Sequence, residues 1–298
     1  MLSRMELHDH AHPRALLFGG SGQIGAALLA RLLAAGWRVD ALSRTEQTAG
    51  EGVRWLRGGF DAMPGLEARY DVVLGCGPLD RFARWFEDAR VDTPRLVAFG
   101  STSLAVKQGS ADAGERELAA RLAVAEARLL ATAARRGTAA TLLRPTLVYG
   151  AGRDLTLSRI AALARRRGWF ALPRGADGLR QPVHVDDLAA TAMSAIAAGA
   201  ASQGRSYDLP GGETLPYRDM VARVLVALQP PARLVELPAP VFAGLAAAAR
   251  AAGLLQGFGA AAQLRLRQDL VFDARPAMDD LGHAPRPFRP DAAMFDPR

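Results

Sequence analysis

The chain has 298 residues, half of them hydrophobic, and a formal net charge of +7 at pH 7. This balance is typical of a globular protein with a sizeable core and excludes an intrinsically disordered chain. A single cysteine, Cys76, excludes an intramolecular disulfide and favours a cytoplasmic location. No apolar stretch is long enough for a membrane span, and residues 241–255, the nearest candidate, contain Arg250, so we expect an amphipathic helix there.

The positive charge comes almost entirely from arginine, and Lys107 is the only lysine in the sequence. Because the arginines are dispersed, we do not expect a nucleic-acid surface, although RNA binding stays a minor alternative. Residues 1–13 lack the apolar segment of a secretory signal, and we expect them to form a flexible tail. His8, His10 and His12 alternate in that tail without a carboxylate or cysteine framework, so no metal site is predicted.

Strands and helices alternate through the first half of the chain, which predicts a parallel sheet covered on both faces. The predicted strands are 15–18, 37–42, 53–56, 71–75, 95–99, 139–143 and 205–209. The predicted helices are 23–35, 80–88, 113–135, 155–167 and 187–198. The fold class is therefore α/β. We expect a doubly wound parallel Rossmann domain at 14–150, to which 184–210 return, and a smaller substrate-binding lobe formed by 151–183 and 211–298.

Three glycines follow the first predicted strand at the spacing G-x-x-G-x-x-G: Gly19, Gly22 and Gly25. A strand that turns sharply into a helix needs glycine, because a Cβ atom would block the close approach of a phosphate. The amide groups of Gln23 and Ile24, at the start of the helix, then bind the anion. Strand, loop, helix and second strand all agree with a dinucleotide site.

The end of the second strand usually decides which dinucleotide is bound, because an acidic residue about 20 positions after the glycines binds the ribose of NAD. Here that position holds Ser43 and Arg44. A guanidinium suits the extra 2′-phosphate of NADP, so we predict NADP over NAD. Asp40, the competing residue, lies in mid-strand. Asp61, after the third strand, is either an acceptor for the adenine amino group or an ordinary turn residue.

Four segments of the sequence resemble the short-chain dehydrogenase/reductase superfamily, in its extended, epimerase/dehydratase-like branch. These segments are 19–25 (GGSGQIG), 96–103 (LVAFGSTS), 143–150 (LRPTLVYG) and 181–189 (QPVHVDDLA). The resemblance implies a seven-stranded sheet with a dinucleotide across its carboxyl edge and a substrate cleft next to the C-terminal lobe. It adds Cys76, Pro145 and Thr146 to the candidate cofactor contacts.

Members of this superfamily normally combine a serine or threonine after the fifth strand with a Tyr-x-x-x-Lys pair on the next helix. Ser101, Thr102 and Ser103 supply the first element. The second is missing, because helix 113–135 contains neither tyrosine nor lysine, and Leu118 and Leu122 stand at the aligned positions. Another group must therefore donate the proton if the protein is an enzyme.

Two other residues are candidates for that proton donor. Lys107 follows the Ser101 segment and either approaches the cleft or is solvated, and Tyr149 is either a donor or a structural residue of its turn. The resemblance gives His184, Asp186 and Asp187 an architectural role, with an aspartate as the expected helix N-cap. It also places Arg180 near an anionic group of the substrate.

The sequence therefore predicts an NADP(H)-binding oxidoreductase or epimerase-like enzyme with a small-molecule substrate and a non-standard proton donor. The alternative is a dinucleotide-binding sensor, assembly factor or structural subunit without turnover, which the missing Tyr and Lys favour. The aromatic residues Phe82, Trp85 and Phe86 belong either to the core or to a homodimer interface.

Overall fold

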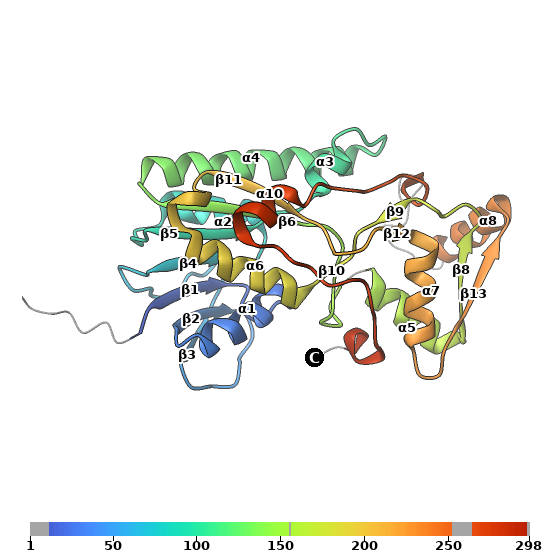
Figure 1. The fold of residues 1–298 in the computed structure, drawn as a ribbon, viewed down its shortest axis with the longest axis horizontal. Coiled ribbons are helices and arrows are strands. Elements are labelled where there is room, and N and C mark those ends of the chain that lie inside the picture. Colours follow the sequence, from blue (N-terminus) through green and yellow to red (C-terminus); the bar gives the residue numbers. More distant parts are fainter. Residues whose placement is uncertain (1–11, 155, 252–263, 297–298) are drawn as a thin grey trace, which may run out of the picture.

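The computed structural model describes residues 12–154, 156–251 and 264–296. Its centre is a parallel sheet of seven strands in the order β11-β6-β5-β4-β1-β2-β3 (Figure 1). The strands are β1 (Arg14–Phe18), β2 (Arg38–Ser43), β3 (Val53–Arg57), β4 (Val72–Gly75), β5 (Arg95–Phe99), β6 (Ala139–Pro145) and β11 (Arg205–Leu209). This order confirms the predicted doubly wound Rossmann sheet.

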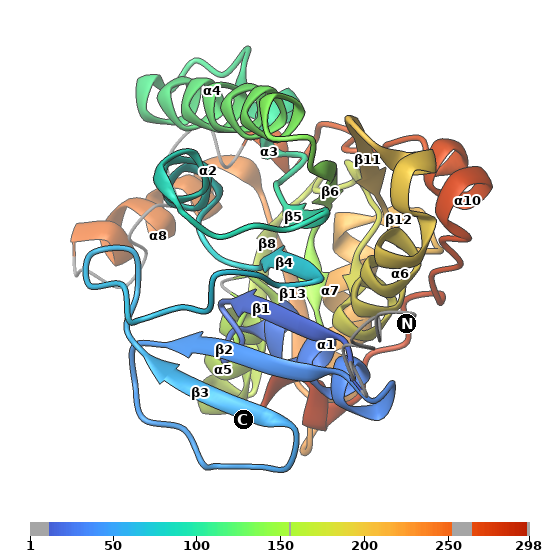
Figure 2. The ribbon, with the colours of Figure 1, turned by 90° about the vertical axis from the view of Figure 1, so that its left-hand side faces the viewer.

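Helices cover both faces of the sheet, with α1 and α6 on one face and α2 and α4 on the other (Figure 2). Their bounds are α1 (Gln23–Ala34), α2 (Leu79–Asp88), α4 (Ala113–Arg135) and α6 (Val185–Ala198). Phe82 and Phe86 of α2 are fully buried, and Phe82 meets Phe18 edge to face at 5.2 Å between ring centroids. These two rings therefore belong to the core and not to a dimer interface.

The C-terminal lobe lies beside the sheet (Figure 1). It has a separate hydrophobic core. Its helices are α5 (Leu157–Arg167), α7 (Tyr217–Ala227) and α8 (Ala239–Ala251), and α10 (Arg275–Leu281) packs back against α6. Short strand pairs complete it: β8 (Trp169–Pro173) with β13 (Arg233–Leu237), β9 (Leu179–Arg180) with β12 (Leu215–Pro216), and β7 (Val148–Tyr149) with β10 (Val183–His184).

Two sequence predictions reach beyond the described residues. Most of the predicted flexible tail, residues 1–11 with His8 and His10, lies outside them, as does the end of the predicted helix at 252–255. Across the three described ranges, no helix has the length and hydrophobicity needed to cross a lipid bilayer.

Asp40 is the centre of a buried polar cluster in the middle of β2. Its carboxylate accepts hydrogen bonds from Arg54 Nε at 2.8 Å and from the Tyr70 hydroxyl at 2.6 Å. Burial alone would raise the pKa of Asp40, but these bonds and the charges of Arg54 and Arg14 outweigh it and hold the pKa below its usual value. Asp40 is therefore a structural residue, held away from the carboxyl edge where a dinucleotide ribose would lie.

Replacing Asp40 with Asn should lower the free energy of unfolding by about 2 kcal/mol at pH 7, less than for a fully buried pair because Arg54 is half exposed. A depressed carboxyl pKa stabilises the protein above the unfolded-state pKa and loses that effect as pH falls through the folded-state value. Urea unfolding should therefore show that the difference in the free energy of unfolding between variant and parent becomes smaller toward pH 3. Asp61→Asn, at a side chain that is 86% exposed, is the control and should change little at either pH.

Candidate functional site

The carboxyl edge of the sheet gathers most of the candidate site residues, as expected for ligand binding in a doubly wound sheet. Gly19, Gly22, Gln23, Ile24 and Gly25 follow β1, Ser43 and Arg44 lie at the end of β2, Asp61 follows β3, Cys76 follows β4, Ser101 and Thr102 follow β5, and Pro145 and Thr146 lie at the end of β6. Lys107 ends the neighbouring helix α3 (Ser103–Lys107), while Tyr149 and Arg180 belong to β7 and β9.

The glycine loop after β1 has no room for side chains at two of its glycines. Gly19 has a left-handed φ of +73°, and its carbonyl oxygen accepts the Gly22 N–H at 2.8 Å. A Cβ atom on Gly25 would lie 2.0 Å from that same carbonyl oxygen. The tight turn predicted from the G-x-x-G-x-x-G spacing is therefore present, and it directs the start of α1 toward the edge of the sheet.

The N-terminus of α1 is suited to an anion. Gly22 is its N-cap and offers no side-chain acceptor, and the first turn contains no acidic residue. The positive end of the helix dipole is thus not neutralised from within the helix. The Gln23 side chain adds a buried Oε1 atom for which the described residues provide no hydrogen-bond partner. Both features fit a phosphate with a neighbouring hydroxyl donor, such as the pyrophosphate and ribose of a dinucleotide.

The end of β2 presents hydroxyl groups and a guanidinium. The Ser43 hydroxyl lies 3.4 Å from that of Ser21 in the glycine loop and donates to the Thr45 carbonyl at 2.7 Å. Arg44 is exposed, and its Cγ atom lies 3.5 Å from where a Cβ on Gly59 would stand, so its stem runs along the backbone after β3. This placement keeps a positive charge beside the predicted adenosine ribose.

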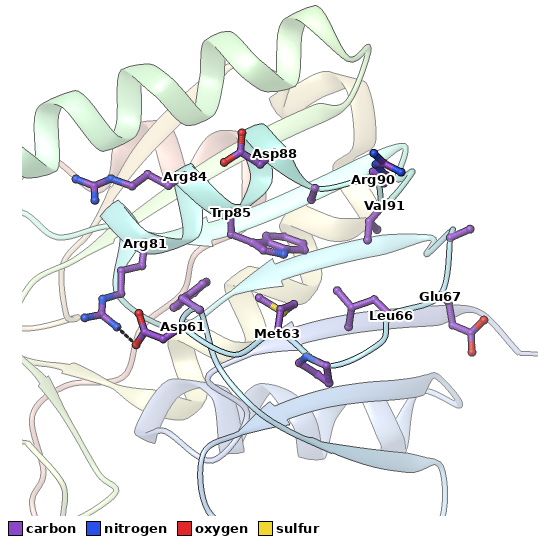
Figure 3. Close-up of a pocket in the computed structure, with 14 residues that line it drawn as sticks. Asp61, Met63, Leu66, Glu67, Arg81, Arg84, Trp85, Asp88, Arg90 and Val91 are labelled. Carbon is purple, nitrogen blue, oxygen red and sulfur yellow. Dashed lines mark hydrogen bonds and ion pairs between the residues drawn. The ribbon is translucent and has the colours of Figure 1, made fainter.

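Asp61 lies at one end of an open groove of about 790 Å³ between the loop after β3 and helix α2 (Figure 3). Its carboxylate is largely exposed and accepts a hydrogen bond from Arg81 at 2.9 Å. Phe60, the preceding residue, stacks on Phe18 at 5.3 Å. Asp61 is thus at the carboxyl edge, where an adenine could reach it, but it already has a cationic partner.

Cys76 contributes its backbone to the edge rather than its thiol. Its N–H donates to the Phe18 carbonyl at 3.0 Å, and its own carbonyl would lie 2.8 Å from a Cβ on Gly19. Burial raises the pKa of the Cys76 thiol to about 12, so the thiol stays protonated. The residue therefore fits the glycine loop by close packing and carries no nucleophile.

Ser101 and Thr102 have different environments at the end of β5. The Thr102 hydroxyl and N–H both donate to the Pro145 carbonyl, at 3.1 and 3.3 Å, which ties β5 to the end of β6. The half-buried Ser101 accepts the Ser103 N–H at 3.1 Å, and its own proton has no acceptor among the described residues. Thr146 donates from its hydroxyl to the Gln181 carbonyl. Ser101 is therefore the hydroxyl available to a substrate.

Helix α4 presents packing residues and an ion pair to the sheet. Leu118 and Leu122 are partly buried, and Glu126 on the same side is 4% exposed. Glu126 accepts from Arg144 Nε at 3.0 Å from each carboxylate oxygen. A Cβ on Gly100 would lie 2.7 Å from Glu126 Oε1, so the pair fits tightly under the end of β5. Sequence reasoning did not find this pair, although Glu126 lies on the apolar stripe of the helix, where an unpaired charge would be costly.

Lys107 lies beside a polar contact between the two lobes. Glu115, in the first turn of α4, accepts hydrogen bonds from the Ser110 hydroxyl at 2.7 Å and from Arg265 of the C-terminal lobe. Burial alone would raise the pKa of Glu115, but these bonds and the charges of Arg265 and Lys107 lower it. Lys107 is partly buried and lies close enough for its charge to act on Glu115.

Tyr149 and Arg180 do not have the environments expected of site residues. Tyr149 is fully buried, its ring meets His184 and Phe288 edge to face at 5.1 and 4.9 Å, and burial raises its pKa to about 12. This location corrects the expectation that Tyr149 could donate a proton to substrate.

Arg180 is 6% exposed and lies over the Tyr217 ring. Its guanidinium donates to three backbone carbonyls, those of Leu179, Gln268 and Arg265. These bonds hold the C-terminal lobe together, which corrects the expected contact between Arg180 and an anionic substrate.

The segment around His184 is architectural, as the resemblance implied, but its N-cap differs from the one expected. Helix α6 begins at Val185, and His184 Nδ1 accepts the Asp186 N–H at 3.2 Å. Asp187 instead forms an ion pair with Arg286 at 2.7 Å. Gly150, with φ of +110°, packs so closely that a Cβ would lie 2.3 Å from His184 Nε2.

Arg153 is a further residue at this edge that sequence reasoning missed. It follows β7 in the C-terminal lobe, and its Nη1 donates to the Ser21 carbonyl in the glycine loop. The two residues are 132 positions apart, and no spacing or motif in the sequence connects them.

No family model matches the chain. Among curated proteins, the 2-alkyl-3-oxoalkanoate reductase of Stenotrophomonas maltophilia is 26% identical over 254 residues, which cover 73% of this chain and 76% of the reductase. Subunit 9 of the NADH dehydrogenase [ubiquinone] 1 alpha subcomplex, from mitochondria of Arabidopsis thaliana, is 28% identical over 108 residues, which cover 36% of this chain and 27% of that subunit.

Among solved structures, UDP-glucuronic acid 4-epimerase from Bacillus cereus in complex with NAD superposes with a TM-score of 0.68 at 12% identity, covering 95% of this chain and 97% of the epimerase. The chain therefore shares the fold of this epimerase. This result confirms the resemblance drawn from the four sequence segments at the level of the fold. Helix α4 of this chain contains neither tyrosine nor lysine.

Proposed function

We propose that the protein is an oxidoreductase of the extended short-chain dehydrogenase/reductase type that binds NADP(H) and reduces a carbonyl group of a small molecule. The observation that carries this proposal is that three features suited to a dinucleotide lie together at the carboxyl edge of the sheet. These are the tight glycine loop, the start of α1, which has no side-chain cap, and the end of β2 at Ser43 and Arg44. They lie in the order in which a dinucleotide would cross them. The reductase from Stenotrophomonas maltophilia supports the reductive direction.

The residues of this chain have separate roles in that reaction. The start of α1 would hold the pyrophosphate, and Arg44 the 2′-phosphate. When bound, the reduced nicotinamide supplies a hydride to the carbonyl carbon. Ser101 would donate a hydrogen bond to the carbonyl oxygen, and Lys107 would deliver the proton that turns this oxygen into a hydroxyl group. The leucines of α4 would exclude water from that end of the cleft.

Lys107→Met should lower kcat for carbonyl reduction by about a hundredfold and leave NADPH affinity unchanged, since a positioned proton donor contributes at least that factor. The assay follows NADPH consumption with a panel of small ketones and 3-oxo acids. Gln108→Met, at the exposed neighbouring position, is the control and should retain the parental rate. Parental kcat in Lys107→Met would show that another group donates the proton.

A second function is favoured by α4 itself, where leucines occupy the aligned Tyr and Lys positions. In this case the protein would bind the dinucleotide without turnover, as a sensor or as a subunit of an assembly. The similarity to an NADH dehydrogenase subunit over 108 residues is in line with this alternative. Tight NADPH binding without consumption for any carbonyl in the panel would favour it over the reductase.

A further inference from the structure

Arg153 connects the C-terminal lobe to the glycine loop of the Rossmann domain. The residue is exposed, and its Nη1 donates to the backbone carbonyl of Ser21. Ser21 lies immediately before Gly22, the N-cap of α1. The guanidinium therefore lies next to the backbone that leads into the proposed phosphate-binding turn.

The segment that carries Arg153 is fixed on both sides. Gly152 donates its N–H to the Met294 carbonyl at 2.9 Å. Asp154 accepts the N–H groups of Thr156 and Ser158 at 3.0 and 3.1 Å, at the start of α5. The backbone of Arg153 is thus held before any ligand arrives, which reduces the entropy lost when its side chain binds an anion.

We propose that Arg153 is a phosphate-binding residue that the C-terminal lobe contributes to the dinucleotide site, where it contacts the pyrophosphate. This inference rests on the proposed NADP(H) binding and adds a contact from the second lobe. A guanidinium is a planar cation whose fork of N–H groups suits phosphate oxygens, and this one lies against the glycine loop at the Ser21 carbonyl.

The alternative is that Arg153 only fixes the shape of the loop through the Ser21 carbonyl. Three probes separate the two roles. NADPH and 2′-phospho-ADP-ribose both carry the pyrophosphate, whereas adenosine 2′-monophosphate keeps the adenine, ribose and 2′-phosphate but has no pyrophosphate. Arg153→Gln keeps an N–H donor and removes the charge, and Arg153→Lys keeps the charge and removes the fork.

Titration calorimetry should show that Arg153→Gln binds NADPH and 2′-phospho-ADP-ribose about tenfold more weakly than the parent, with a smaller loss in Arg153→Lys. Binding of adenosine 2′-monophosphate should stay at the parental level in both variants. Arg159→Gln, at an exposed arginine on α5 of the same lobe, is the matched control and should bind all three probes like the parent.

Two results would overturn the role of Arg153 while leaving the proposed function intact. One is parental NADPH affinity in Arg153→Gln, and the other is an equal loss for adenosine 2′-monophosphate, which would assign Arg153 to loop shape alone. A parent protein that binds none of the three probes would instead overturn the proposed NADP(H) binding itself.

Discussion

Replacing Arg44 with Ala should weaken NADPH binding by tenfold to about a hundredfold and leave NADH binding unchanged, because only NADPH carries the 2′-phosphate. Charge-assisted hydrogen bonds between a guanidinium and a phosphate are worth about 1.5–3 kcal/mol, and each 1.4 kcal/mol is about tenfold in affinity. Arg44 is suited to such bonds because it is exposed and its stem lies along the backbone at Gly59.

Arg38→Ala provides a matched control for this titration. Arg38 is also exposed but begins β2, whereas Arg44 follows its end, so the two arginines lie at opposite edges of the sheet. The control should bind both dinucleotides like the parent. Equal losses of NADPH and NADH affinity in Arg44→Ala would contradict the 2′-phosphate contact, and a parent that prefers NADH would contradict the choice of NADP.

Gly25→Ala should destabilise the protein by about 3 kcal/mol and abolish measurable dinucleotide binding. Helix propensity alone favours Ala over Gly by about 1 kcal/mol, so the sign of the effect depends on space. The new Cβ would lie 2.0 Å from the Gly19 carbonyl oxygen, which is held by the Gly22 N–H. Because backbone must move to make room, the cost of overpacking exceeds the gain in propensity.

Urea unfolding and NADPH titration check the two parts of this prediction. Gly65→Ala is the control, because a Cβ at Gly65 would meet no atom within 4 Å and its φ is not positive. That variant should unfold and bind like the parent. Parental stability in Gly25→Ala would mean that the glycine loop is looser than the structure shows.

The sheet and its helices could be predicted because their signals are local. Apolar strands alternate with amphipathic helices, and the seven strands of the sheet occur within two residues of the predicted bounds, as at 139–143 against Ala139–Pro145. The two-residue strands of the C-terminal lobe could not be predicted. Val183 and His184 pair with Val148 and Tyr149, and so short a pairing leaves no periodicity in the sequence.

A part of the candidate site could be predicted only where one continuous segment contains all the residues that form it. The glycine loop is such a segment, since its three glycines and the helix that follows are continuous. Tyr149 and Arg180 were misassigned because their burial depends on partners such as Phe288 and Gln268, about 90 or more residues away. Arg153 was missed for the same reason, because its partner Ser21 lies 132 positions earlier in the chain.

Lys107 can also be labelled selectively by chemical modification. Every other basic side chain in the sequence is an arginine or a histidine, so an amine-acylating reagent meets one side-chain amine, at the end of α3 beside Glu115. The extent of labelling at Lys107, compared by mass spectrometry with that at the α-amino group, reports the solvent accessibility of the Lys107 side chain. A ligand that binds next to Lys107 should slow this labelling, which would allow ligands to be screened without any assay of turnover.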